Sequence, residues 1–177
     1  ENIDIGGPTL LRAAAKNFPS VLVVVDPKDY TWISERIDSG GVFSIDERKK
    51  LARKAFQHVA VYDTAISSWL NDESMLSPSE ISIGLNKIDD LRYGENPHQA
   101  GAVYSNLLGT GGIVNSRQIH GMPMSYTNYL DADSAWTTVN SFDQNACVIV
   151  KHTNPCGIAL DNQQSHAFKK AFEGDSV

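Results

Sequence analysis

The sequence predicts an α/β fold, and three segments carry that prediction. Residues 21–25 and 146–150 are unbroken apolar runs, which is typical of strands buried on both faces. Residues 45–71 place apolar side chains at three- and four-residue steps, as an amphipathic helix does. Buried strands that alternate with helices are the pattern from which α/β folds are built.

The composition permits a buried core and argues against one class of protein. The 177 residues suffice for one domain or parts of two, with 41% apolar and 20% charged residues. The net charge is −6, from 15 basic and 21 acidic residues, which argues against a general nucleic-acid-binding protein. A local basic pocket on such a protein can still take a small anion.

Cysteine content and hydropathy bear on the cellular compartment. The two cysteines, Cys147 and Cys156, are too few for a disulfide framework and indicate a reducing cytoplasm. No run approaches the roughly 18 apolar residues of a membrane span, and the chain begins with no signal peptide. We therefore expect a cytoplasmic protein with no membrane partner. Because the chain starts without Met and stops after a helical stretch, we also expect a piece of a longer protein.

The first half of the chain is predicted to be mainly helical. Pro8 suits the first turn of a helix and Pro19 ends it, with an alanine-rich stretch between them. After the strand at 21–25, a short helix is expected at about 28–38. The long helix at 45–71 begins with a capping box of Ser44 and Glu47. Its apolar stripe consists of Leu51, Ala55, Val59, Tyr62, Ile66 and Trp69/Leu70. Its opposite face is basic, and we expect that face to be solvated, with Arg48, Lys49, Lys50, Arg53 and Lys54.

The second half is predicted to contain short strands and two helices. Residues 71–80 are polar, include a Ser-Pro-Ser step and indicate a domain boundary. The elements expected after it are strands at 81–88 and 102–104, a glycine loop at 109–112, a helix from about Asn128 to Phe142, the strand at 146–150 and a helix at 163–173.

Lys151 and His152 stand at the end of the strand predicted for 146–150 and precede an Asn-Pro turn. Open α/β sheets place their chemistry at the carboxyl ends of strands. Lysine offers a positive charge, and histidine offers a proton acceptor that titrates near neutrality. The pair suits a reaction in which an amine loses a proton while an oxyanion forms. The alternative is a strand whose end simply reaches solvent.

Three further groups of residues could bind or act on a ligand. Asp4, next to a Gly-Gly helix start, and Lys16 could orient water and polarise a carbonyl, or could simply be an ordinary helix start and end. Arg92 could clamp a phosphate and Tyr93 could stack on a heterocycle, unless their segment is a surface turn. Asn128 could bind a ligand amide or cap a helix.

A zinc site is not expected. Zinc nucleobase deaminases carry His-x-Glu and a later Pro-Cys-x-x-Cys. This chain has Pro155-Cys156, but Ala159 stands where the second cysteine should be, and no His-x-Glu occurs. Cys147 and Cys156 are also too far apart for a zinc knuckle.

Four runs of the chain, taken together and in order, are distinctive. They are DIGGPTLLRAAAKN at 4–17, LRYGENPHQ at 91–99, His120-Gly121 with SYTNYLDAD at 125–133, and KHTNPCGIA at 151–159. These runs resemble the bifunctional AICAR transformylase/IMP cyclohydrolase family of late purine biosynthesis. The resemblance implies that residues 1–77 are the C-terminal part of a methylglyoxal-synthase-like cyclohydrolase domain. It implies that residues 78–177 begin a cytidine-deaminase-like transformylase domain.

The resemblance also implies a chemistry. The family transfers a formyl group from the co-substrate 10-formyltetrahydrofolate to AICAR and closes the product, FAICAR, to IMP, with no catalytic metal. Lys151 and His152 match its catalytic pair, and Asp4 and Lys16 match cyclohydrolase positions. The residues that match nucleotide contacts are Arg92, Tyr93 and Asn128. Met122-Pro123 depart from the family, which often has Lys-Glu there. A homodimer with sites at the subunit interface is implied.

The chain by itself is expected to lack both activities. Two alternatives to the enzyme remain open at this point. A non-catalytic purine-nucleotide-binding module would keep the nucleotide contacts and survive replacement of Lys151 and His152. A zinc-dependent deaminase on the related fold would hold stoichiometric zinc.

Overall fold

The computed structural model describes residues 2–71 and 77–174. Its chain forms two compact units, Glu1–Leu85 and Asn86–Val177, named unit 1 and unit 2 below. The predicted boundary at 71–80 lies partly outside the described residues, and the division of the chain at 77/78 remains a prediction. The α/β class is confirmed in its coarse form, a mixed structure with two small two-stranded sheets among the described residues.

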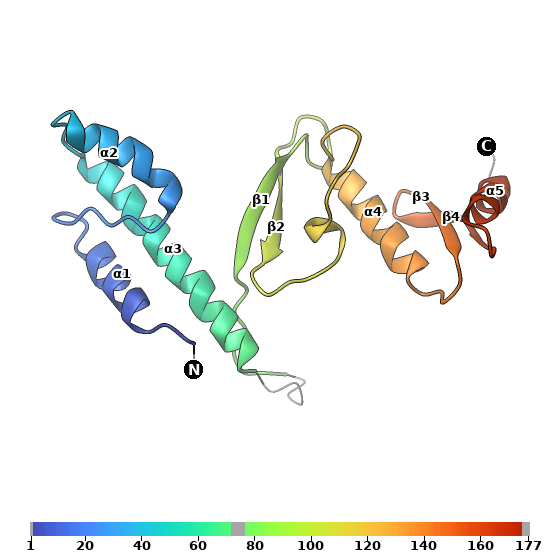
Figure 1. Cartoon of the computed structure of the whole chain (residues 1–177), viewed down its shortest axis with the longest axis horizontal. Coiled ribbons are helices and arrows are strands. Elements are labelled where there is room, and N and C mark those ends of the chain that lie inside the picture. Colours follow the sequence, from blue (N-terminus) through green and yellow to red (C-terminus); the bar gives the residue numbers. More distant parts are fainter. Residues whose placement is uncertain (1, 72–76, 175–177) are drawn as a thin grey trace. The chain divides into compact units, whose positions relative to one another are not determined.

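Unit 1 is built on a pair of helices. Its elements are α1 (Gly6–Lys16), η1 (Pro27–Asp29), α2 (Tyr30–Asp38) and α3 (Ile45–Trp69), and Figure 1 shows α1 alongside α3. The core between them contains Ala15 from α1 and Ala52 and Ala55 from α3, all at most 3% exposed. Because these side chains are small, the two helices can pack closely. The two helices run antiparallel, since Asp4 contacts Tyr62 while Pro19 contacts Arg48.

The strand predicted at 21–25 is not present. None of its residues belongs to a strand, and neither sheet of the described chain includes it. Instead, Val23 is buried in the α1–α3 core and Val25 packs against that core. A strand needs a neighbouring strand to receive its backbone hydrogen bonds. The apolar side chains of residues 21–25 are therefore explained by packing in the core and not by strand pairing.

The long helix α3 begins as predicted. Ser44 N donates to Glu47 Oε2 (2.8 Å), and Glu47 N donates to Ser44 Oγ (3.2 Å), which completes the capping box. The predicted apolar stripe is buried at Leu51, Ala55 and Val59, but Trp69 and Leu70 are 67% and 63% exposed. The start of α1 lies at Tyr62, and at a rise of about 1.5 Å per residue Trp69 is about 10 Å further along α3. Nothing in α1 reaches it.

The basic face of α3 is only partly solvated. Lys49, Lys50 and Arg53 are exposed, as predicted. Lys54 instead bonds to Asp26 and Asp29, both at 2.7 Å, and Arg48 donates to the Pro19 carbonyl oxygen (2.8 Å). These contacts attach the segment before α2 to α3.

Unit 2 contains both sheets. The pair β1 (Leu85–Leu91) and β2 (Gly101–Asn106) precedes η2 (Ile113–Asn115) and α4 (Tyr126–Val139), and β1 starts with the last residue of unit 1. The hairpin β3 (Ala146–Lys151) and β4 (Asn154–Leu160) precedes α5 (Gln164–Gly174). Figure 1 shows the hairpin between α4 and α5, and both helices contact it. The strands predicted at 102–104 and 146–150 are thus confirmed, and the one predicted at 81–88 is shifted to 85–91.

The surroundings of Lys151 differ from the expected open sheet. The partner of β3 is the antiparallel strand β4, with Lys151 opposite Asn154, so the connecting turn consists of His152 and Thr153 alone. The predicted Asn-Pro turn is wrong, because Asn154 and Pro155 begin β4. Proline has no N–H for the ladder, and the register shifts where Pro155 faces Val150.

A glycine lets α5 lie directly on the hairpin. Gly157 of β4 is buried, and a Cβ added there would meet the carbonyl oxygen of Ala171 in α5. Ala167 and Ala171, both at most 1% exposed, form the contact face of α5. Only a residue without a side chain fits at this position.

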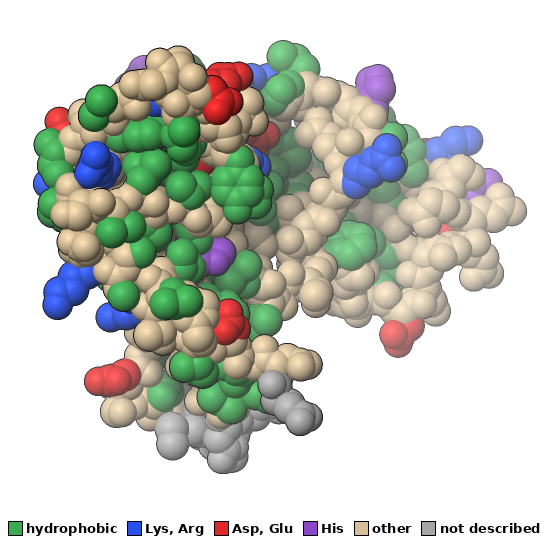
Figure 2. Space-filling model, turned by 60° about the vertical axis from the view of Figure 1, so that its left-hand side comes forward, with side chains coloured by type: hydrophobic (Ala, Val, Ile, Leu, Met, Phe, Trp, Pro, Cys, Tyr) green, Lys and Arg blue, Asp and Glu red, His purple; other side chains and the backbone are tan. Residues whose placement is uncertain are grey.

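Two surface properties complete the description. Large apolar side chains remain exposed in both units, Leu10 and Trp69 among them, and Figure 2 shows hydrophobic and charged side chains interspersed on the face drawn. Among residues 2–71 and 77–174, no helix is both long and apolar enough to cross a membrane.

Candidate functional site

The turn that carries His152 has an unusual backbone. The φ angles of His152 and Thr153 are +55° and +65°, in the left-handed region that a type I′ hairpin turn requires at both positions. Asparagine and glycine are the usual residues there, whereas a β-branched residue such as threonine is a genuine outlier. Each such residue costs on the order of 1–3 kcal/mol unless its surroundings compensate for it.

Helix α4 supplies that compensation. The Thr153 N–H donates to Asp131 Oδ1 (2.7 Å), and the Ser134 hydroxyl donates to the Thr153 carbonyl oxygen (2.6 Å). Within the turn, the His152 carbonyl oxygen accepts from Thr153 Oγ1 (2.6 Å) and from Asn154 Nδ2 (2.9 Å). Both backbone groups of Thr153 are thus bonded to one helix, which fixes the conformation of the turn.

The two residues predicted to act chemically are consecutive in the chain. Lys151 ends β3, His152 opens the turn, and both side chains are exposed. The ammonium and the imidazole are therefore both available to a ligand that approaches from solvent. Such a pair can stabilise a negative charge and accept a proton within the same ligand.

Arg92 and Tyr93 form a compact unit just after β1. The Arg92 guanidinium lies 4.8 Å from the centre of the Tyr93 ring, and Arg92 Nη2 donates to Tyr93 Oη (3.1 Å). The hydrogen bond between the Tyr93 oxygen and the Ser125 hydroxyl, and the one that Arg92 donates to the same oxygen, hold the pKa of the Tyr93 phenol below its usual range. Met122, which departs from the family pattern, lies against Arg92, with Nη1 3.7 Å from its sulfur.

The same segment is joined to the start of α4 through the backbone. Arg92 N donates to the Met124 carbonyl oxygen (3.3 Å), and Tyr126 N donates to the Tyr93 carbonyl oxygen (3.2 Å). These two bonds place Arg92 and Tyr93 beside the first turn of the helix.

Asn128 belongs to the first turn of α4 and takes part in its cap, one of its two predicted roles, although the helix starts two residues earlier than predicted. The helix begins at Tyr126, and its cap is the fully buried Ser125. Asn128 completes a capping box, because its N–H donates to Ser125 Oγ (3.3 Å) and its Oδ1 accepts from Ser125 N (3.1 Å). The Asn128 side chain is exposed, and its amide nitrogen takes no part in the box. It therefore keeps a donor for a ligand.

Helix α4 thus connects five predicted residues, namely Arg92, Tyr93, Asn128, Lys151 and His152. Asn128 lies in its first turn, with Arg92 and Tyr93 beside that turn. Asp131 and Ser134 of the same helix hold the turn that follows Lys151. Asn128 and Asp131 are three residues apart, so they are neighbours on the helix surface, about 4.5 Å apart along its axis. The structure brings the transformylase candidates together around α4. Sequence reasoning missed Ser125 and Ser134, although Ser125-x-x-Asn128 resembles a capping box.

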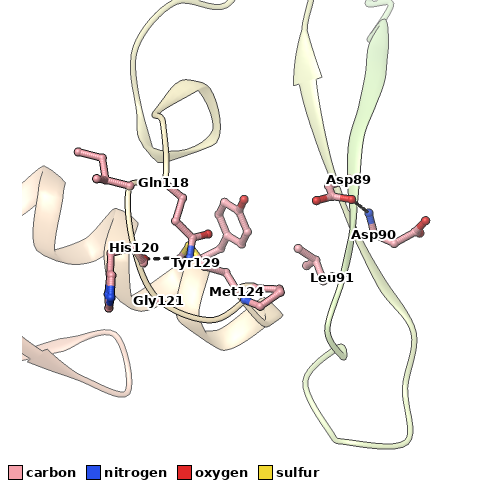
Figure 3. Close-up of a pocket in the computed structure, with 10 residues that line it drawn as sticks. Asp89, Asp90, Leu91, Gln118, His120, Gly121, Met124 and Tyr129 are labelled. Carbon is pink, nitrogen blue, oxygen red and sulfur yellow. Dashed lines mark hydrogen bonds between the residues drawn. The ribbon is translucent and has the colours of Figure 1, made fainter.

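A cavity of about 320 Å³ lies beside this group (Figure 3). Its lining residues are Asp89, Asp90, Leu91, Gln118, Ile119, His120, Gly121, Pro123, Met124 and Tyr129. Gln118 Nε2 donates to the carbonyl oxygens of His120 (3.2 Å) and Met122 (2.8 Å), which shapes the loop over the cavity. The lining has two carboxylates and no lysine or arginine, so a phosphate is better placed at Arg92 than inside it.

The cyclohydrolase candidates of unit 1 are not brought together. Asp4 precedes α1, where its Oδ1 accepts from Gly7 N (3.1 Å) and its N–H donates to Tyr62 Oη (2.9 Å). Lys16 is the last residue of the same helix. The helical rise separates the two by about 15 Å. Asp4 instead borders a cavity of about 150 Å³ with His58 and Tyr62, which sequence reasoning had assigned to no site.

No group of three or more metal-ligating side chains occurs in the part of the chain that the structure describes. Both cysteines are free thiols.

Comparison with known proteins gives one family. The profile of the AICARFT/IMPCHase bienzyme matches residues 14–177. The bifunctional purine biosynthesis protein purH of Dictyostelium discoideum is 48% identical over 204 residues, covering 99% of this chain and 38% of the relative. The PurH proteins of Persephonella marina and Clostridium kluyveri are 46% and 48% identical, and each comparison covers 99% of this chain and 35% of the relative. The chain therefore spans little more than a third of the length of these relatives.

Proposed function

Because the chain belongs to the AICARFT/IMPCHase bienzyme family, we propose that it serves two steps of purine biosynthesis. The first is formyl transfer from 10-formyltetrahydrofolate to AICAR, and the second is closure of FAICAR to IMP with loss of water. The observation that supports this most strongly is the Lys151–His152 pair on a strained turn that α4 holds in place. Since the relatives are about three times as long, the activities belong to the complete bienzyme and not to this chain alone.

In formyl transfer, the 5-amino group of AICAR attacks the formyl carbon. His152 accepts the proton that the amine loses, and the Lys151 ammonium stabilises the oxyanion that forms on the formyl oxygen. The tetrahedral intermediate then collapses, the bond from carbon to the folate nitrogen breaks, and that nitrogen takes a proton. Both groups are exposed, so a ligand can approach both of them from solvent.

The nucleotide contacts follow from the geometry at the start of α4. Arg92 is the cation available for the phosphate, and a guanidinium can bind two phosphate oxygens at once. Its stacking on Tyr93 limits the orientations of both side chains. The free amide nitrogen of Asn128 is a donor for an oxygen of AICAR. Asn128 and Asp131 are neighbours on α4, and Asp131 holds the turn that carries His152, which supports a site in which His152 meets the amine.

The cyclohydrolase residues have separate tasks. Asp4 positions the formamido group, and Lys16 stabilises charge during ring closure. Their separation along α1 means that they act on different parts of the nucleotide. We assign residues 1–77, which make up most of unit 1, to the C-terminal part of the methylglyoxal-synthase-like domain. Residues 78–177 begin the cytidine-deaminase-like domain.

The remaining assignments are proposals of the same kind. The two free thiols, Cys147 and Cys156, are consistent with a cytoplasmic location. The complete bienzyme is proposed to be a homodimer, with sites at its subunit interface and with no catalytic metal.

The decisive experiment measures AICAR-dependent release of tetrahydrofolate from 10-formyltetrahydrofolate by the complete bienzyme. Wild type is compared with His152→Ala, with His166→Ala, a half-exposed histidine on α5, as the matched control. We expect a loss of on the order of 10²-fold or more for His152→Ala, as for removal of a general base, and wild-type rates for the control. Equal rates in all three proteins would remove His152 from the mechanism. A wild type that binds AICAR without turnover would instead be a binding module.

A further inference from the structure

The turn after Lys151 does not have the sequence of a self-sufficient hairpin. Two-residue turns with both φ angles positive are normally built from Asn-Gly or similar pairs, because those residues tolerate the left-handed region. Here they are His152 and Thr153, and the β-branched Thr153 is especially unsuited to it. A turn of this sequence needs support from outside the hairpin to keep its shape.

That support comes from two side chains of one helix. Asp131 accepts the Thr153 N–H at 2.7 Å, and Ser134 donates to the Thr153 carbonyl oxygen at 2.6 Å. The residues are three apart on α4, so they lie on neighbouring positions of its surface. Both side chains are half-buried, whereas the turn that they hold is exposed.

The helix is a rigid base for these contacts. Its start is closed by the Ser125–Asn128 capping box and bonded through the backbone to Arg92 and Tyr93. Its body packs against β3. The distance between the nucleotide contact at Asn128 and the turn contact at Asp131 is therefore set by one helical turn. A shift of the turn relative to α4 would move Lys151 and His152 but leave Asn128 in place.

We propose that Asp131 and Ser134 are positioning residues for formyl transfer, which hold Lys151 and His152 at a fixed distance from the bound nucleotide. This inference rests on the proposed function. Neither residue touches the substrate. They act on the backbone of Thr153, and through it on the placement of the catalytic pair. Their loss should lower kcat and leave the KM for AICAR nearly unchanged.

The first test compares three variants of the complete bienzyme. Asp131→Ala removes the acceptor, and Asp131→Asn keeps an oxygen that can accept the same N–H. Asp133→Ala removes an exposed carboxylate two residues along the same helix, on its other side, and is the matched control. We expect kcat to fall on the order of tenfold to a hundredfold in Asp131→Ala, as for a displacement of about 1 Å, with KM within about twofold of wild type. Asp131→Asn should recover most of the rate.

Two outcomes would overturn the proposal. One is a kcat for Asp131→Ala within about twofold of that for Asp133→Ala, where a displacement effect would be far larger. The other is an equal loss in Asp131→Asn and Asp131→Ala, since the hydrogen bond alone would then not explain the effect.

A second test makes the turn less dependent on its hydrogen bond to Asp131. Glycine adopts positive φ without steric strain, so Thr153→Gly relieves the more strained of the two turn positions. Combined with Asp131→Ala, it should recover a substantial part of the lost kcat. If the double variant is no faster than Asp131→Ala alone, the support of the turn is not what Asp131 contributes.

A third measurement separates this inference from the proposed function. Hydrogen exchange at the Thr153 amide should be slow in wild type and at least tenfold faster in Asp131→Ala, with the exchange of the α4 core unchanged. If wild type transfers no formyl group, the proposed function fails, and exchange at Thr153 still decides whether Asp131 holds the turn. Fast exchange in wild type would refute the contact itself.

Discussion

The two units arrange their candidate residues in opposite ways. In unit 1, Asp4 and Lys16 stand at the two ends of α1, and the interior between α1 and α3 is filled by small apolar side chains. In unit 2, a single helix contains Asn128, bonds to the backbone of Tyr93 and holds the turn that follows Lys151. The difference shows that residues at neighbouring positions on one helix can form a single site. Residues at opposite ends of a helix are too far apart to do so.

The largest expected effect tests whether the two units act independently. Lys151→Ala should lower formyl transfer on the order of 10²–10³-fold, because the oxyanion loses its nearest positive charge. FAICAR closure should be unchanged, since the candidates for that step are in unit 1. Both reactions are measured on the complete bienzyme, with Lys169→Ala, an exposed lysine on α5, as the control. An equal loss of both reactions would contradict the independence of the two units.

A stability effect confined to unit 2 comes next. Gly157→Ala places a methyl group against the Ala171 carbonyl oxygen and should destabilise unit 2 by about 1–3 kcal/mol, as overpacking does. Gly174→Ala is the matched control, because its added Cβ would be 4.0 Å from Gly157, an ordinary contact. Urea unfolding of both variants of the complete bienzyme provides the measurement. An unchanged midpoint for Gly157→Ala would show that α5 can move away from β4 freely.

A smaller effect sharpens the assignment in unit 1. Tyr62→Phe removes the hydroxyl that accepts the Asp4 N–H, a bond worth about 1 kcal/mol, so FAICAR closure should slow about fivefold. Formyl transfer should keep its wild-type rate. Tyr30→Phe, at a 55% exposed tyrosine in the same unit, serves as the control. If the Tyr62→Phe variant closes FAICAR at the wild-type rate, the hydrogen bond between Tyr62 and Asp4 does not contribute to this reaction.

The smallest effect is a pH dependence of unit 1. The hydrogen bond from Lys54 lowers the pKa of Asp26 below 3.8, and the bonds to Asp26 and Asp29 raise the pKa of Lys54 above 10.5. A lowered carboxyl pKa stabilises the fold above pH 3.8 and loses that effect as the pH falls through the folded value. A raised lysine pKa stabilises it below pH 10.5 and loses that effect as the pH rises through the folded value.

The contribution of Lys54 should therefore be constant near neutral pH and shrink at either extreme. The difference in urea midpoint between wild type and Lys54→Gln is expected to be small, because the pair is partly exposed, and smaller at pH 3 than at pH 7. Lys50→Gln, which removes an exposed charge from the same face of α3, should show no such trend. A difference that grows toward pH 3 would contradict the assigned direction.

Local signals predicted most of the elements. The Ser44–Glu47 capping box located α3 correctly, because both partners are close in sequence. The strand predicted at 21–25 was wrong because an apolar run reports burial and not pairing, and here it fills a helix–helix interface. Trp69 continues the periodic apolar stripe of α3, yet it is exposed because α1 packs along α3 only as far as Tyr62. Periodicity cannot show how far a partner helix extends.

The candidate site was predicted as a set of residues but not as an arrangement. The motif contained His152 and Thr153, but nothing in it showed that these two residues form a left-handed turn. The contacts that hold the turn cross 22 and 19 residues of sequence, to Asp131 and Ser134. Long-range bonds of this kind carry no local signature. Whether the named residues perform the proposed chemistry remains a prediction for the experiments above.

The strained turn also has a consequence for the order in which unit 2 folds. A hairpin with a His-Thr turn gains little from closing by itself, so β3 and β4 should remain apart early in folding. Helix α4 has its own capping box and can form from nearby residues alone. The hairpin would then close against a helix that already exists. Mutations at Asp131 should slow folding, because the contact between Asp131 and the turn would form in the rate-limiting step. Mutations at the contact between α5 and Gly157 should mainly speed unfolding.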